Sequence, residues 1–581
     1  MVTGLSPARG GGSAATLCPA HSVAGRGSSE PGWRHEMASS LAPASASRCL
    51  PHPGGSQHHG FDSSKHLIGR SGKPAHSFWG FAEESVARER HKGITIVRAL
   101  LAAPGLAGVL LISGWTAWSG PVASAAEPPP AAPPNIVFIY ADDMGWGDLA
   151  CHGTSWLKTP NLDRLARDGI DFHQFNVLSP VCSPSRVAAM TGQFPSRYCI
   201  YTAFGSPETN RTQGMADWLD PQAPTLPRFL QSVGYRTAHV GKWHMGSGDL
   251  PGAPVMAAYG IDESMVYHGP GPRLSKRQVA GSAVQFIENL QSKQPFFLNV
   301  WIPQTHLVLQ PSQASMDQFQ DLDPRRQVYA ATVYDADHTV GRVLEALRAA
   351  GVEENTIVLF SSDNGPAGVE WQPQARPPRP EDGTMEKGFG KYYSVGSTGG
   401  LRGRKAHLYE GGVRTPLLVR WPGKAPAGTI NDTTVFTAVD LLPTLCAAAG
   451  MSLPAAYRGD GENLLPAWLG EPVRRTTPIF WHVQGGAANI RPEHRGSYAV
   501  RDGDWKLYVS GDGSRAELYD LATDRSESKD VSQQHPDIVG RMTAATLAWK
   551  ATLPDKPNPA CVAPAIPPHR KQEPAQEGPS G

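Results

Sequence analysis

The chain has 581 residues, enough for a large hydrophobic core and for more than one domain. Its 53 lysines and arginines balance 52 aspartates and glutamates, so no overall charge points to nucleic acid or to a strongly acidic partner. The hydrophobic content of 40% fits a soluble globular protein.

The N-terminal region differs in composition from the rest. Residues 1–93 are rich in Ser, Gly, Ala, Pro and His without periodicity, which predicts disorder or a start codon placed too early. Segment 94–134 holds an uncharged apolar stretch, 99–126, that follows a basic run and ends in small residues before a proline-rich linker. This order is typical of a secretory signal peptide, so we expect export to the periplasm or the extracellular space. A retained membrane anchor is the alternative, because the stretch is long enough to span a bilayer.

An unbroken apolar run over 135–140 predicts a strand whose two faces are both buried by helices. The run ends at Asp142 and Asp143. Two adjacent carboxylates at the end of a buried strand are costly unless a cation compensates them, which favours a metal site over a simple turn. A short amphipathic helix is expected next, over 161–169.

The polar segment 179–192 predicts a loop that leads into a helix, with Ser183 as the N-cap and Gly192 just past the end. Cys182 then lies at the helix N-terminus, where the helix dipole favours an anion, and Arg186 lies about one turn further on. A buried structural cysteine beside a surface arginine is the alternative. The five cysteines beyond the leader are too few for a disulfide framework.

Two further strands have basic side chains after their ends. Strand 235–240 runs into Lys242 and His244, which are two residues apart and therefore point the same way in an extended chain. Strand 295–301 is followed by His306. Because such residues at strand ends are usually on the surface, these positions alone do not establish a site.

The strand expected over 356–360 repeats the pattern of the first one, since it ends at Asp363 and Asn364. In open α/β sheets, ligands bind at the carboxyl ends of the strands. Asp142, Asp143 and these two residues together form a hard, all-oxygen site, which suits Ca²⁺ or Mg²⁺ and argues against zinc. We expect Ca²⁺ rather than Mg²⁺, because three carboxylates and an amide leave little room for water.

The remaining pattern predicts an α/β fold, a mixed sheet sandwiched by helices with a smaller C-terminal subdomain of antiparallel strands and one helix. Helices are expected over 225–234 and 329–350, and the long loop 366–400 leads back to a basic segment around Lys405. From residue 471 the chain changes to short alternating strands and a final helix at 535–553. The expected divisions are a leader (1–93), a signal-like segment (94–134), a catalytic domain (135–470), an α+β subdomain (471–556) and a disordered tail (557–581).

Several of these motifs occur together in one known family. Residues 182–186 match its Cys-x-Pro-x-Arg signature, 234–244 match its Gly-Tyr-x-Thr-x-x-Val-Gly-Lys-Trp-His signature, and 403–414 match its Gly-x-Lys…Glu-Gly-Gly-x-Arg segment. The chain over about 135–555 therefore resembles the type I, formylglycine-dependent sulfatases, whose fold is alkaline-phosphatase-like. Within that family, the runs 142–148 and 159–165 look most like arylsulfatase A and N-acetylgalactosamine-6-sulfatase relatives, which indicates a carbohydrate sulfate.

The resemblance implies hydrolysis of a sulfate monoester. A formylglycine-generating enzyme would oxidise Cys182 to 3-oxoalanine, that is, formylglycine. One hydroxyl of its hydrate attacks sulfur, and the other then expels sulfate. An unmodified thiolate has no second hydroxyl, which explains the need for an aldehyde. The metal ligands implied are Asp142, Asp143, Cys182, Asp363 and Asn364, with Ca²⁺ as the ion.

The resemblance also implies a role for each basic residue. Arg186 would hold the modified residue, and His244 would act as the base. Sulfate oxygens would be bound by Lys242 and Lys405, and His306 with Lys405 would assist the leaving oxygen. The sequence around His306 differs from the family's commoner Pro-His-x-Pro form, which leaves that position with less support from the motif.

Two alternatives stay open. A phosphomonoesterase or phosphonate hydrolase of the same superfold is one, although such enzymes usually have Thr or Ser where Cys182 stands. The other is a non-catalytic protein that binds sulfated glycans and in which Cys182 is never modified. A membrane is expected as a partner only if 99–126 is retained, and no nucleic-acid partner is expected.

Overall fold

The computed structural model describes residues 132–246, 248, 250–290, 293–368, 383–484 and 497–564. The predicted leader and nearly all of the signal-like segment 94–134 lie outside these residues. No helix among the described residues has both the length and the apolar character needed to cross a membrane.

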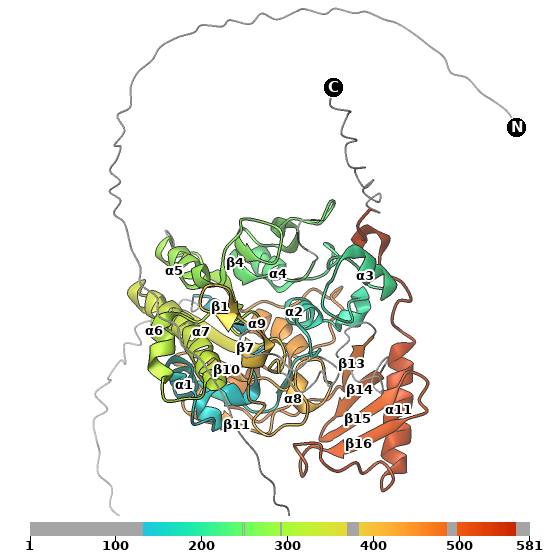
Figure 1. The fold of residues 1–581 in the computed structure, drawn as a ribbon. Coiled ribbons are helices and arrows are strands. Elements are labelled where there is room, and N and C mark those ends of the chain that lie inside the picture. The colour runs from blue at the N-terminus through green and yellow to red at the C-terminus, as the bar shows by residue number, and fades with distance from the viewer. Residues whose placement is uncertain are drawn as a thin grey trace, which may run out of the picture. The chain divides into compact units, whose positions relative to one another are not determined.

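An eight-stranded mixed sheet forms the centre of the larger part of the chain (Figure 1), in the order β11-β2-β10-β7-β1-β6-β4-β5. Its strands run parallel except β10, which is antiparallel to both of its neighbours. Their bounds are Asn135–Ala141 (β1), Ile170–Phe172 (β2), Arg236–Lys242 (β4), Glu263–Tyr267 (β5), Phe296–Ile302 (β6), Thr356–Ser362 (β7), Leu417–Arg420 (β10) and Thr429–Asn431 (β11).

Strand β1 explains why the central strands are apolar throughout. Ile136, Phe138 and Tyr140 belong to one hydrophobic core, and the alternating Val137 and Ile139 belong to a second. Because successive side chains of a strand point to opposite faces, each face packs on its own layer of helices. The first core includes α2 (Cys182–Thr191), α4 (Leu226–Ser232) and α9 (Leu441–Ala448), and the second includes α1 (Pro160–Arg167), α5 (Val279–Glu288) and α7 (Pro324–Ala349).

Two helix starts differ from the predictions. Helix α2 begins at Cys182, and its N-cap is Val181 rather than Ser183, whose hydroxyl accepts a hydrogen bond from the Phe204 amide at 3.1 Å. Its end at Gly192 is confirmed, with the left-handed φ of 64° that favours glycine. Helix α7 begins five residues before the predicted start, because Asp323 caps the amides of the first turn.

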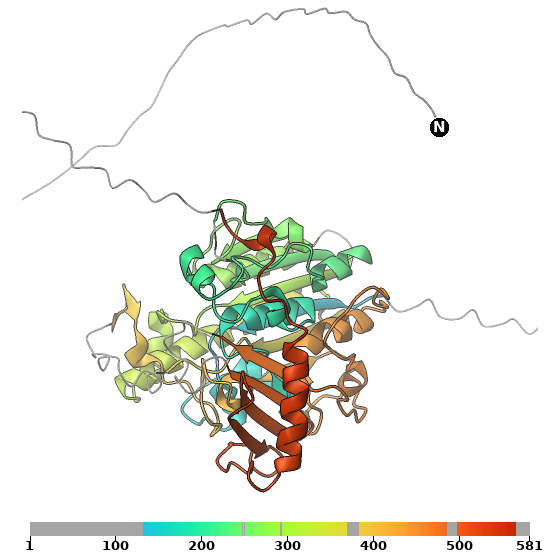
Figure 2. The ribbon, with the colours of Figure 1, turned by 90° about the vertical axis from the view of Figure 1, so that its right-hand side faces the viewer.

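The C-terminal part forms a four-stranded antiparallel sheet, β13-β14-β15-β16. Figure 2 shows α11 along one face of this sheet, where it contacts β14 and β15. The predicted small sheet with one helix is therefore confirmed, while the domain boundary near residue 470 stays a prediction. The bounds are Ile479–Val483 (β13), Ser497–Asp502 (β14), Trp505–Ser510 (β15), Ala516–Asp520 (β16) and Pro536–Lys550 (α11).

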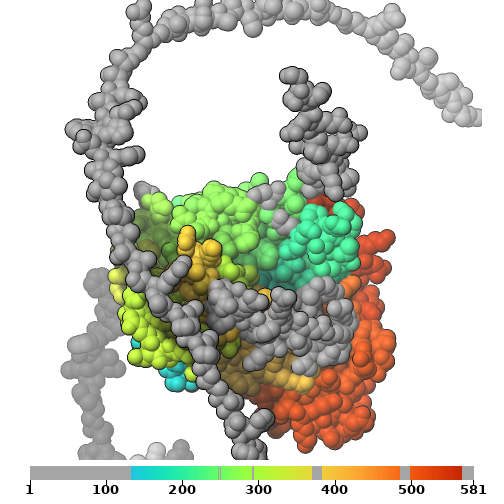
Figure 3. All heavy atoms as spheres, viewed as in Figure 1, coloured from blue at the N-terminus to red at the C-terminus, as the bar shows by residue number. Residues whose placement is uncertain are grey.

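Buried charges join the two sheets, and Figure 3 shows the C-terminal part of the described chain, in orange, packed against the rest. The Lys506 ammonium on β15 lies 2.6 Å from the Glu410 carboxylate and 3.3 Å from that of Glu527. Glu410 begins the short helix α8 (Glu410–Val413), which directly precedes β10 of the large sheet. The Trp481 indole of β13 also donates to the Val177 carbonyl at 2.8 Å.

Shorter elements complete the described chain. They are α3 (Pro207–Thr212), α6 (Gln313–Met316), α10 (Leu465–Trp468), β3 (Phe175–Asn176), β8 (Gly383–Thr384), β9 (Gly388–Phe389) and β12 (Phe436–Thr437). The first residues of the predicted tail pack on the main body, since Asp217 accepts from the Ala563 amide at 2.7 Å. Within the described ranges all cysteines are unpaired thiols: Cys151, Cys182, Cys199, Cys446 and Cys561.

Candidate active site

The predicted acidic residues meet at one edge of the large sheet. Strands β1 and β7 are parallel neighbours, with Ala141 paired to Ser362, so the residues that follow each strand emerge side by side. Four buried residues place metal-ligating atoms within 4.8 Å of one another: Asp142, Asp143, Cys182 and Asp363.

Cys182 lies at the centre of this cluster as the first residue of α2. Its Sγ is 3.3 Å from Asp142 Oδ1, 3.3 Å from Lys242 Nζ and 3.9 Å from Lys405 Nζ. Burial, followed by the Asp142 and Asp363 carboxylates, raises the pKa of the thiol far above its usual value. The thiol is therefore neutral, and an unmodified Cys182 is a poor nucleophile.

Arg186 is fully buried one turn further along α2. Its Nη2 and Nε donate to Asp363 Oδ2 at 2.6 and 3.0 Å, and its Nη1 donates to the Lys242 carbonyl at 3.0 Å. The guanidinium also lies 5.0 Å from the centre of the Trp301 ring. Arg186 thus fixes a candidate metal ligand and the end of β4 at the same time.

Two lysines approach the acidic pair from different elements. Lys242, at the end of β4, lies 2.6 Å from Asp142, and Lys405 lies 2.6 Å from Asp143. Burial lowers the pKa of each lysine, but the adjacent carboxylates outweigh that effect and raise both above the usual value. Both lysines are therefore charged, and together with Arg186 they balance three carboxylates.

The two predicted histidines are neutral. Burial, then the charge of Lys242, holds the pKa of His306 at about 4, and the same two causes hold the pKa of His244 well below its ordinary value. His306 Nδ1 is 2.8 Å from the Leu307 carbonyl, which can only accept, so this nitrogen carries the hydrogen. His306 Nε2, 3.9 Å from Asp143, therefore presents its lone pair. His244 Nδ1 is buried and has no hydrogen-bond partner among the described residues.

Asn364 completes the set of oxygen donors. Its side-chain amide donates to Asp143 Oδ1 at 2.7 Å, while its Oδ1 is buried and accepts no hydrogen bond from any described residue. An orphaned amide oxygen beside three carboxylates is the donor set that hard divalent cations prefer. Burial and the Asp142 carboxylate also raise the pKa of Asp363 to about 7, a repulsion that a bound cation would relieve. The residues present therefore fit Ca²⁺ or Mg²⁺.

Lys276 was not predicted from the sequence. It is 5% exposed, and its Nζ donates to the His306 carbonyl and, at 2.8 Å, to the Val308 carbonyl. Burial lowers its pKa to about 8. Lys276 thus holds the backbone around His306. Because its partners are backbone carbonyls about thirty positions away, no local pattern in the sequence predicts this contact.

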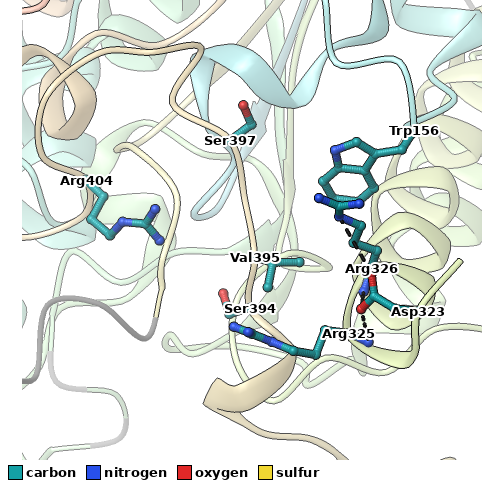
Figure 4. A pocket seen from close by; sticks show the side chains of 8 residues that line it. All are labelled: Trp156, Asp323, Arg325, Arg326, Ser394, Val395, Ser397 and Arg404. Atoms are coloured by element: carbon teal, nitrogen blue, oxygen red, sulfur yellow. Dashed lines mark hydrogen bonds and ion pairs between the residues drawn. The ribbon is translucent and has the colours of Figure 1, made fainter. Parts of the chain in front are cut away.

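A separate pocket has a volume of about 550 Å³, and Figure 4 shows the side chains that line it. Arg404, the neighbour of Lys405, lines it, together with Arg325 and Arg326 from the first turn of α7. Ser394 in its wall is 2% exposed, and its hydroxyl has no hydrogen-bond partner in the described part of the chain. The other lining residues are Trp156, Asp323, Val395 and Ser397.

Comparisons with known proteins agree with this arrangement. The Sulfatase family model matches residues 134–451, and the model described as N-sulphoglucosamine sulphohydrolase, C-terminal, matches residues 403–548. Human N-acetylgalactosamine-6-sulfatase is 32% identical over 416 residues, which cover 65% of this chain and 74% of that protein. Human arylsulfatase A is 31% identical over 426 residues, which cover 66% and 76%.

A solved structure has a similar fold. The crystal structure of Ps i-CgsB in complex with k-i-k-neocarrahexaose has a TM-score of 0.61 and 27% sequence identity to this chain. The match covers 73% of this chain and 94% of that one.

Proposed function

Because the chain belongs to the sulfatase family, with its alkaline-phosphatase-like fold, it is a sulfuric ester hydrolase of sulfated carbohydrates or aryl sulfates, and we propose that its substrate is a sulfated saccharide. The cluster around Cys182 carries this proposal. Three carboxylates and three protein cations balance there, so a bound divalent cation leaves a positive surplus that suits an anionic ester.

The proposal includes the conversion of Cys182 to formylglycine by a formylglycine-generating enzyme. An unmodified thiol has no second hydroxyl with which to expel sulfate, which supports this conversion. The proposed ligands of the divalent cation are Asp142, Asp143, Asp363 and Asn364, with the modified residue 182. We favour Ca²⁺ over Mg²⁺, since this oxygen-rich set leaves little room for water. When present, the hydrated aldehyde and the cation supply the nucleophilic oxygen and a Lewis acid.

The basic residues would bind and orient the ester. Lys242 and Lys405 are charged and within 4 Å of the Cys182 sulfur, so they are placed to bind sulfate oxygens. Arg186 holds Asp363 and the carbonyl of Lys242, and thereby orients the site.

We assign the base and the contacts to the leaving oxygen to the two histidines and Lys405. His244 is neutral, and its buried Nδ1 is available as the base. His306 presents the Nε2 lone pair, and the charged Lys405 would assist the leaving oxygen by stabilising the negative charge that develops there.

The arginine-lined pocket supports a saccharide rather than a small aryl sulfate. Consecutive residues connect the pocket to the acidic cluster, since Arg404 lines the pocket and Lys405 contacts Asp143. A substrate with a second anionic group can therefore contact both places, whereas a single aryl sulfate ring occupies only one.

We also propose export of the protein, on the basis of the sequence segment 94–126. N-terminal sequencing of secreted protein tests this, and a mature chain that begins after the small-residue run at about Ala126 is expected. Secreted protein that still begins at residue 1 would contradict it.

Mass spectrometry across 179–197 tests the modification in protein from a host that makes formylglycine. We expect the aldehyde at residue 182, and Cys182→Ala should lower sulfatase turnover by at least roughly 10²–10³-fold. Cys446→Ala is the matched control, because Cys446 is buried in α9 away from the site. Full turnover by Cys182→Ala would refute the mechanism, and a preference for phosphate monoesters would refute the substrate class.

A further inference from the structure

A second cluster of metal-ligating side chains lies outside the active site. Cys151 Sγ, one ring nitrogen of His152 and a carboxylate oxygen of Asp171 all lie within 4.8 Å of one another. His173 Nε2 is 3.3 Å from Asp171 Oδ2, the same oxygen that His152 contacts. The first two residues belong to the short 3-10 helix η2 (Ala150–His152), and the other two lie in and just after β2.

Both ring nitrogens of His152 face hydrogen-bond acceptors at this cluster. Its Nδ1 is 2.6 Å from the Trp146 carbonyl, which only accepts, so Nδ1 carries the hydrogen. In a neutral ring Nε2 is then bare, yet it lies 2.9 Å from Asp171 Oδ2, which is another acceptor. Either a second proton or a metal ion has to lie between these two atoms.

Several features favour the metal ion over the proton. A proton on Nε2 satisfies one contact, whereas a metal ion also engages the thiol and the second imidazole. Asp171 is 5% exposed, and its Oδ1 is buried without a hydrogen-bond partner among the residues described. The Nδ1–H bond to a backbone carbonyl is the arrangement that orients metal-bound histidines. The Trp146 ring also stacks on His152 at 4.1 Å and forms an apolar wall.

We propose that Cys151, His152, Asp171 and His173 bind a zinc ion. A thiolate, two imidazoles and a carboxylate form a four-ligand set of the structural type, and their two negative charges neutralise Zn²⁺. Sulfur and nitrogen ligands select zinc over Ca²⁺, which separates this site from the all-oxygen cluster. Donors on a tetrahedron around zinc lie about 3–4 Å apart, so Cys151, His152 and Asp171 are near that spacing, and His173, which is 3.3 Å from Asp171 but outside this group of three, has to move toward the ion to become the fourth ligand. Cys151 is exposed, which provides an entry path.

The location gives this ion a structural role. The loop that carries Cys151 and His152 begins directly after Asp142 and Asp143, and β2 lies elsewhere in the large sheet. A zinc ion therefore ties the segment that follows the acidic pair to the sheet.

Metal analysis of the full-length chain tests the proposal. We expect about one zinc ion per chain after purification without chelator, and a thiolate-to-cobalt charge-transfer band when Co²⁺ is added to the chelator-treated protein. Cys151→Ser should abolish the band, and His173→Gln should weaken Co²⁺ binding at least tenfold. Both side chains are partly or fully exposed, so these variants fold.

Two control variants separate this site from other thiols. Cys182→Ala and Cys446→Ala should each keep the zinc ion and the cobalt band. The proposal is overturned if wild-type protein contains no zinc and gives no band, if Cys151→Ser keeps the band, or if Cys182→Ala loses it.

Discussion

Each nitrogen of the Arg186 guanidinium donates to an assigned acceptor in a space without solvent. Asp363 receives two of these donors and the backbone at Lys242 receives the third. A lysine in this place would keep the positive charge but lacks the planar fork, so it cannot reach both partners. Position, rather than charge alone, is therefore what this residue contributes.

The variant Arg186→Lys tests that statement. We expect kcat for a sulfate ester to fall by roughly 10²-fold or more, because Asp363 and the end of β4 lose their common support. The control is Arg197→Lys, whose Asp460 partner lies elsewhere and whose side chain is 36% exposed. Equal kcat values for Arg186→Lys and wild type would contradict a positioning role.

His482, which lies outside the active site, makes the stability of the folded chain depend on pH. Its ring stacks at 4.3 Å on Tyr498, and burial lowers its pKa to about 3. Because the folded pKa lies below that of the unfolded chain, the unfolded state binds more protons between about pH 6.5 and pH 3. The stability associated with neutral His482 is therefore present above pH 6.5 and is lost as the pH falls.

A variant without the titrating ring should lose this dependence. When the pH falls from about 7.5 to 5, the free energy of unfolding should decrease on the order of 2 kcal/mol less in His482→Phe than in wild type. Thermal or urea unfolding at the two pH values measures the difference. His338→Phe, at an exposed position of α7, is the control and should follow wild type.

Helix α7 shows what local pattern does and does not reveal about an element. Its apolar face from Val333 to Leu347 predicts the helix, but its first turn lies outside that face and is set by the Asp323 cap. Strands β1, β6 and β7 are predictable because burial of both faces makes them apolar throughout. Strands β2 and β11 have three residues each, too few to show a period, so the sequence does not indicate them.

Variants in the first turn of α7 test the class of substrate. Arg325→Ala combined with Arg326→Ala should raise KM for a multiply sulfated oligosaccharide about tenfold or more, since two pocket cations are lost. KM for a small aryl sulfate should stay unchanged. Arg348→Ala, near the other end of the same helix, is the control. An equal rise for both substrates would contradict a saccharide contact in the pocket.

At the scale of the whole molecule, the two sheets depend on charges buried between them. Glu410 bonds to both Lys506 and Arg414, and Lys506 also reaches Glu527. The Lys506 pairs are fully shielded from water, so removal of the lysine leaves two carboxylates buried together. The two Lys506 contacts are not evident in the sequence, because Glu410 and Glu527 lie 96 and 21 positions away from the lysine.

Lys506→Met should therefore destabilise the chain by about 3–5 kcal/mol, the usual effect of breaking a buried ion pair. Urea unfolding of the purified chain measures it, and Lys550→Met at the exposed end of α11 is the control. A loss of less than about 1 kcal/mol would show that the two sheets do not depend on this pair.

The burial of Cys182 also determines whether its modification comes before or after folding. Once α2 has packed, only 2% of this residue is exposed, and the cluster of carboxylates and lysines encloses its sulfur. An enzyme that oxidises this side chain needs direct access to it, so the proposed modification has to precede folding. We expect the formylglycine-generating enzyme to modify an unstructured peptide spanning 179–197 in vitro and to leave the folded protein unmodified. A chain that folds too early would then be intact in shape and permanently inactive.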